Sequence, residues 1–166
     1  MRHIIGILLQ NEAGALTRVT GLISARGYNI ESLSVAATND PTVSRVTLVT
    51  IGSDHVIAQI NAQLQKLVDV VAVEDMTGGD HLARELLLIK LQISAEHLES
   101  VGALLGRVGG RVLSSNPSSY IIELAGTESA IGEFIANVGA FGEIVEVVRS
   151  GVLGIARGNP RLHVIK

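Results

Sequence analysis

One order of apolar segments occurs twice along this chain, and it constrains the fold more than any single motif does. Each half carries a strand-like run, a helix-like run, two strand-like runs joined by a turn, a second helix-like run and a last strand-like run. The repeat is one of order and not of sequence. It predicts an α+β protein made of two consecutive βαββαβ units of the ferredoxin-like kind, each with two helices on one face of an antiparallel sheet.

In the first half, strands are expected over residues 4–9, 29–37, 43–51 and 70–76. The first helix should start near Asn11, whose side chain can cap it, and should end at Gly27, which can adopt a left-handed turn. The second helix follows Ser53 and Asp54, which are typical of a helix start. Its apolar face is formed by Ile57, Ile60, Leu64 and Leu67.

In the second half, strands are expected over residues 86–93, 111–115, 119–125 and 144–148. One helix should end at Gly109, and the other carries Ile131, Phe134, Ile135 and Val138 at helical spacing. We therefore place an N-terminal domain at residues 1–77, a linker at 78–85 and a C-terminal domain at 86–166. Residues 150–158 are rich in glycine, and the residues after them should be loose.

Composition excludes several classes of function. The chain has no cysteine, so it has no disulfide and no thiolate metal site. Its net charge is −3 and its aromatic content is 2%, which argues against a basic face or stacking platform for nucleic acid. No apolar run reaches the ~20 residues that cross a bilayer, and the N-terminus does not resemble a signal peptide. These features predict a cytoplasmic protein that binds neither membrane nor nucleic acid.

No catalytic or metal-binding constellation is recognisable. The five histidines are scattered, and none forms a pair with the spacing of metal ligands. The serines of residues 114–119 flank a turn and have no histidine and carboxylate beside them in the pattern of a nucleophile. We therefore predict no catalytic residue, no metal ligand and no cofactor in this chain.

The expected strands are apolar on both faces, although the helices of such a unit cover only one face. The second face should therefore also be buried. A sheet edge with free N–H and C=O groups is a further pairing surface. Both features predict self-association, most simply as a two-fold homodimer.

The loop before the first helix is the best candidate for a ligand site. A helix start leaves backbone N–H groups unpaired, and a carboxylate is stabilised there. Gly14 lets a ligand approach the backbone closely, and Asn11 and Asn29 offer both donors and acceptors. A plain structural interpretation, in which these residues only cap the helix or form turns, accounts for the same pattern.

Two segments closely resemble the small regulatory subunit of acetolactate synthase (acetohydroxyacid synthase), an ACT-domain family. They read Asn11-Glu12-Ala13-Gly14-Ala15-Leu16 and Arg26-Gly27-Tyr28-Asn29-Ile30-Glu31-Ser32-Leu33. Supporting segments lie at residues 40–45, 63–70, 83–86 and 144–151, so the resemblance covers nearly the whole chain. It implies that the first unit is an ACT domain that binds an amino acid.

The resemblance also implies a function and a set of site residues. The subunit would have no activity of its own, would activate a large catalytic subunit that carries thiamine diphosphate, magnesium and FAD, and would confer feedback inhibition by valine. Valine, or alternatively leucine or isoleucine, would bind where two ACT domains meet. The implied binding residues are Asn11, Gly14, Ala15, Leu16, Asn29 and Ile30, the last two from the partner chain, with Thr17 and Ala36 nearby.

Several alternatives remain open on the sequence alone. A free-standing ACT amino-acid sensor without an enzyme partner would show the same motifs. A small enzyme on the same fold would need a cluster of titratable residues, and the sequence offers none. The second unit has Ser94-Ala95-Glu96-His97 where the first has its glycine loop, so we expect it to serve dimerisation or contact with the catalytic subunit. Whether it binds a divalent ion or a nucleotide is open.

Overall fold

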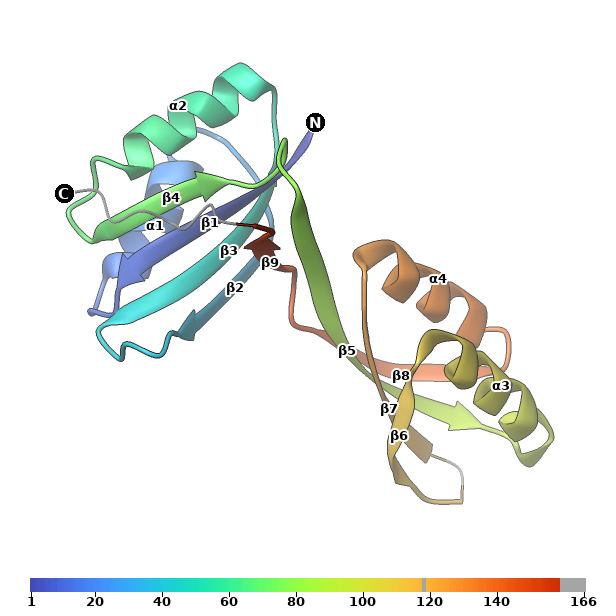
Figure 1. The fold of residues 1–166 in the computed structure, drawn as a ribbon. Coiled ribbons are helices and arrows are strands. Elements are labelled where there is room, and N and C mark those ends of the chain that lie inside the picture. Colours follow the sequence, from blue (N-terminus) through green and yellow to red (C-terminus); the bar gives the residue numbers. More distant parts are fainter. Residues whose placement is uncertain (118, 159–166) are drawn as a thin grey trace. The chain divides into compact units, whose positions relative to one another are not determined.

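The structure, a computed structural model, describes residues 1–117 and 119–158 (Figure 1). The described residues divide into two compact units, one formed by residues 1–83 together with residues 152–158 and the other by Arg84–Gly151. Each unit has an antiparallel sheet with two helices, so the predicted α+β class and the βαββαβ order are confirmed. None of the helices within the described residues is both long enough and apolar enough to cross a membrane.

The first unit contains a four-stranded sheet with the strand order β2-β3-β1-β4, in which every neighbouring pair of strands is antiparallel. Its elements are β1 (Arg2–Gln10), α1 (Ala15–Ser24), β2 (Ile30–Ala37), β3 (Val43–Ile51), α2 (Asp54–Leu64) and β4 (Val70–Asp75). Alternate residues of β1 point to opposite faces, so Ile5, Ile7 and Leu9 pack against both helices. Helix α2 is capped as predicted, since the Ser53 hydroxyl accepts a hydrogen bond from the Val56 N–H at 3.4 Å.

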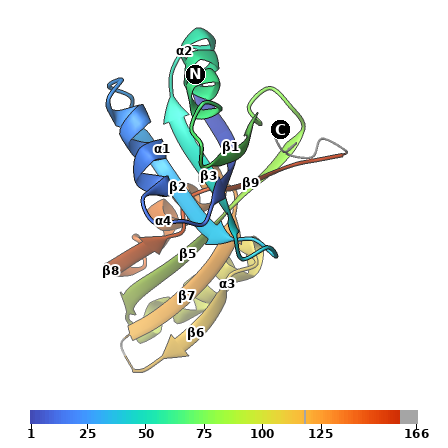
Figure 2. The ribbon, with the colours of Figure 1, turned by 90° about the vertical axis from the view of Figure 1, so that its left-hand side faces the viewer.

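The second unit repeats this plan with a sheet in the order β6-β7-β5-β8 (Figures 1 and 2). Its elements are β5 (His81–Ile93), the short 3₁₀ helix η1 (Ala95–His97), α3 (Leu98–Val108), β6 (Arg111–Ser115), β7 (Ser119–Gly126), α4 (Glu128–Val138) and β8 (Gly142–Arg149). Helix α3 ends at Gly109 as predicted. Phe134 of α4 is the largest fully buried side chain of this core.

Strand β5 starts at His81, although residues 78–85 were expected as a linker. The local sequence of these residues is rich in polar side chains and has little strand character of its own. Long-range pairing decides their conformation instead, because Glu85 pairs with Gly126 of β7 and the Asp80 carbonyl accepts a hydrogen bond from the Arg157 N–H at 2.8 Å. The same Glu85 forms a two-pronged ion pair with Arg149, with distances of 2.8 and 2.6 Å.

A ninth strand, β9 (Leu153–Ala156), lies in the glycine-rich segment for which no strand was expected. Val152 packs with Ile4, Val49 and Met76 on the face of the first sheet that the helices leave uncovered. The Gly154 carbonyl accepts a hydrogen bond from the Arg45 guanidinium at 3.3 Å. The predicted second domain of residues 86–166 therefore differs from the structure, in which residues 152–156 pack on the first unit. Its last part, residues 159–166, lies outside the described residues.

Part of the second face of the first sheet is thus buried, and this burial comes from within the chain. Ile4 and Val49 are at most 6% exposed in the single chain, without any second copy. The burial of this face is therefore no evidence for a dimer. The edge strands of the first sheet, β2 and β4, are features of the first unit that still favour pairing with another chain.

Candidate functional site

Helix α1 starts without a side-chain cap. Gly14 is its N-cap residue, with φ of +85°, in the left-handed region that favours glycine. Among the described residues, no side chain caps the first turn of the helix, although the Ala15 N–H donates to the Glu12 backbone carbonyl at 3.2 Å. Beyond Ala15, the start of α1 presents backbone N–H groups and the positive end of the helix dipole.

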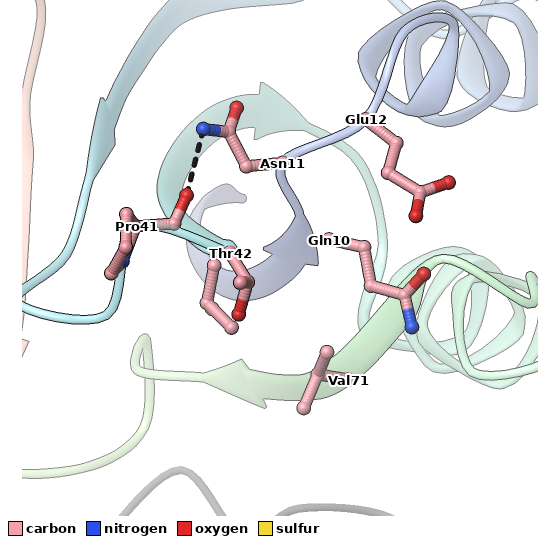
Figure 3. A pocket seen from close by; sticks show the side chains of 7 residues that line it. Gln10, Asn11, Glu12, Pro41, Thr42 and Val71 are labelled. Carbon is pink, nitrogen blue, oxygen red and sulfur yellow. Dashed lines mark hydrogen bonds between the residues drawn. The ribbon is translucent and has the colours of Figure 1, made fainter.

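Asn11 does not cap α1, so this prediction was wrong. A capping side chain reaches the N–H groups two or three residues further on, and the helix begins too late for Asn11 to do so. The Asn11 side-chain N–H instead donates to the Pro41 carbonyl at 3.0 Å, and its backbone N–H donates to the Thr42 carbonyl at 2.7 Å. Asn11 thereby ties the loop of residues 11–14 to the turn between β2 and β3 (Figure 3).

A pocket of about 440 Å³ opens beside this tie, between the end of β1, the turn before β3 and the start of β4 (Figure 3). Of the predicted binding residues, only Asn11 lines it. The full lining consists of Gln10, Asn11, Glu12, Pro41, Thr42, Val43 and Val71. Gly14, Ala15 and Leu16 are not part of its wall.

The other predicted residues of the loop lie around the helix start. Ala15 is buried and Leu16 packs partly against the core, whereas Gly14 and Thr17 are exposed. Ala36 lies towards the same end of the sheet, because it pairs with Arg45, which in turn pairs with Leu8 near the end of β1. The structure therefore brings the predicted residues of the loop and the helix start together with Ala36 at one end of the sheet.

Asn29 and Ile30 lie at the opposite end of the sheet. Ile30 pairs with Thr50, and Thr50 pairs with His3 at the start of β1. With about 3.3 Å per residue, the length of β1 separates them from the loop of the same chain by about 20 Å. Within one chain, the predicted residues do not form one site.

An ion pair beside the loop was missed from the sequence. The Arg18 guanidinium contacts both carboxylate oxygens of Asp69, with Nη2 2.8 Å from Oδ1 and Nε bonded to Oδ2. A Cβ atom added to Gly14 would lie 3.1 Å from Arg18 Nη1. The available signal was an isolated aspartate in the apolar turn before β4, where burial of a carboxylate requires a partner.

The hydrogen bond from Arg18 lowers the pKa of Asp69 below the usual carboxyl range, against the opposing effect of desolvation. A carboxyl group with a lowered pKa stabilises the fold above its unfolded-state pKa of about 3.9, and this stabilisation is lost as pH falls through the folded-state value. We expect the free energy of unfolding in urea to contain the full contribution of this pair, nearly constant, between about pH 7 and 5, and to decline below about pH 4. The Asp69→Asn variant should show a shallower acid decline, and parallel curves for the two proteins would contradict the assignment.

Two family models together match both units. A model described as "AHAS small subunit-like ACT domain" matches residues 5–72, and a model described as "Small subunit of acetolactate synthase" matches residues 84–158. Among the described residues, no group of three or more His, Cys, Asp or Glu side chains could hold a metal ion. The fold and these matches define the first unit as an ACT domain, a module of the regulatory class.

Full-length relatives give the same result. The chain is 47% identical over 159 residues to the acetolactate synthase isozyme 3 small subunit of Escherichia coli, with 96% of this chain and 98% of the relative covered. It is 40% identical over 162 residues to the acetolactate synthase small subunit of Haemophilus influenzae, covering 98% and 99%. A crystal structure of the small subunit from Thermotoga maritima superimposes with a TM-score of 0.86 at 29% identity and covers 96% of this chain and 99% of that chain.

The chain belongs to the family of acetolactate synthase small subunits, which are regulatory and not catalytic. The family resemblance read from the two motif segments is thereby confirmed. The role of each site residue remains a prediction.

Proposed function

We propose that this chain binds a branched-chain amino acid, first of all valine, at the interface of two ACT domains and thereby controls acetolactate synthase. In this proposal it activates the large catalytic subunit and makes it sensitive to feedback inhibition. The thiamine diphosphate, magnesium and FAD implied by the family resemblance belong to that catalytic subunit. The observation that carries the proposal is the uncapped start of α1 at Gly14.

The helix start suits the carboxylate of an amino acid. Its N–H groups are not used by a capping side chain, and the helix dipole favours negative charge there. Gly14 has no side chain between the ligand and this backbone, and it is exposed. Leu16 and Ile30 are partly buried apolar residues that can contact the aliphatic side chain of a ligand.

A two-fold dimer through β2 would complete the site. Strand β2 is an edge strand of the first sheet, and Val35 on it is 42% exposed. If β2 pairs antiparallel with its own copy, the start of one β2 lies beside the end of the other. Asn29 and Ile30 of one chain then approach the end of the sheet where the Gly14 loop of the other chain lies.

Titration calorimetry on the purified protein tests this proposal. Valine should release or absorb heat with a stoichiometry fixed by the dimer, because each site needs residues of both chains. Aspartate serves as a control, since its charged side chain does not fit apolar contacts. If valine, leucine and isoleucine all give no heat of binding, the proposed effector function is wrong.

A further inference from the structure

We propose that Asp69 is a positioning residue that sets the affinity of the effector site, because it holds both ends of the loop at residues 11–14. This inference rests on the proposed function, since the loop is the proposed site. Asp69 lies in the turn between α2 and β4 and contributes no atom to the helix start itself. It acts through Gln10 and Arg18.

The two contacts of Asp69 bracket the loop. Its backbone carbonyl accepts a hydrogen bond from the Gln10 N–H at 2.8 Å, immediately before the loop. Its carboxylate binds the Arg18 guanidinium, which belongs to the first turn of the helix that follows the loop. Asp69 is only 3% exposed, so the protein around it fixes its position.

Arg18 transmits this position to Gly14. Its Nη1 is the nearest atom to the space where a Gly14 side chain would begin, at 3.1 Å from that point. Nε and Nη2 are both bonded to Asp69, so the guanidinium plane has one orientation. Without the carboxylate, Arg18 would lose both hydrogen bonds that orient its guanidinium and would keep only the electrostatic attraction of Glu12, which fixes no orientation.

Loss of the Asp69 carboxylate should therefore lower the affinity for the ligand, although it removes no contact with the ligand. Binding would have to order the Arg18 side chain and the loop at the moment of association. The cost of ordering one long side chain corresponds to a loss of affinity of up to about tenfold. The extent of inhibition at saturating effector should not change, because the bound state is the same.

The test compares Asp69→Asn with a matched control in the second unit, Glu85→Gln. Both carboxylates are nearly fully buried, at 3% and 4% exposure, and both bind an arginine through two bonds. Each substitution removes one such pair, but only Asp69 adjoins the loop. Valine affinity is measured by calorimetry, thermal unfolding by circular dichroism, and inhibition and activation in the complex with a catalytic subunit.

We expect Asp69→Asn to weaken valine binding by about tenfold and to leave maximal inhibition and activation unchanged. Glu85→Gln should keep the valine affinity of the unsubstituted protein, even if it lowers the thermal stability as much as Asp69→Asn does. Equal affinity losses in both variants, or no loss in Asp69→Asn, would overturn the inference.

A second variant covers the case in which Asp69→Asn does not fold. Arg18 is half exposed, so Arg18→Gln removes the same pair from the solvent side and should reproduce the affinity loss. Arg18→Lys keeps the charge but cannot bind both carboxylate oxygens in a fixed plane. The valine affinity of this variant should therefore lie between that of the unsubstituted protein and that of Arg18→Gln. If the unsubstituted protein binds no valine, the proposed function fails and this inference with it; if it binds and neither Arg18 variant changes affinity, only the inference fails.

Discussion

Replacing Gly14 with aspartate should abolish inhibition by valine and leave activation of the catalytic subunit intact. The new carboxylate would occupy the space in front of the helix start, where we place the carboxylate of the ligand. Like charges brought together in an interface cost several kcal/mol, so the affinity should fall by roughly a hundredfold or more. The measurement is the inhibition curve of the complex against valine concentration.

A matched control separates this effect from strain. Gly14 has φ of +85°, and any other residue there is strained. Gly109 has φ of +72°, has open space around its would-be side chain and lies in the second unit. Gly109→Asp adds the same charge with similar strain, so it should keep valine inhibition. If Gly14→Asp loses activation together with inhibition, misfolding and not loss of the site is the explanation.

Among core substitutions, Phe134→Ala should be one of the most destabilising. Phe134 is 1% exposed and packs in the second core between α4 and the sheet. Truncating a buried phenylalanine removes its transfer free energy and leaves a cavity, which together cost about 3–5 kcal/mol. Denaturant unfolding measures this loss directly.

Gly132→Ala in the same helix is the control for Phe134→Ala. A Cβ atom at Gly132 meets nothing within 4 Å, so the substitution fits without strain. Alanine in a helix interior is more favourable than glycine by about 0.5–1 kcal/mol. This variant should therefore be neutral or slightly more stable, and a similar loss in both variants would contradict the described packing.

The sequence was sufficient to predict features that depend on short-range patterns. The helical spacing of Ile131, Phe134 and Val138 matches α4, and Gly109 ends α3 as expected. The βαββαβ order of elements followed from the order of apolar runs, and this order predicted the ferredoxin-like arrangement.

Long-range contacts explain what the sequence did not predict. Strand β9 depends on partners far away in the sequence. It pairs with β5, and the Gly154 N–H donates to the Thr47 hydroxyl, 107 residues away, at 3.3 Å. The capping role given to Asn11 was wrong because the Pro41 carbonyl competes for its side chain. The pair of Arg18 and Asp69 joins residues 51 positions apart, so the isolated aspartate indicated that a partner was needed but no local pattern identified Arg18 as that partner.

The separation of Asn11 and Asn29 changes how the candidate site is understood. Both residues flank α1 in the sequence, which invites the interpretation that they form one pocket. The register of the sheet places them at opposite ends instead. A site that uses both would therefore have to combine two chains, and effector binding would then be coupled to the geometry of the proposed dimer.

The most direct test of the regulatory claim is reconstitution. The purified chain is mixed with a purified acetolactate synthase catalytic subunit, and acetolactate formation is measured with and without valine. We expect no activity from the chain alone, higher activity of the mixture than of the catalytic subunit alone, and inhibition of the mixture by valine. An unchanged rate on mixing, with no response to valine, would contradict it.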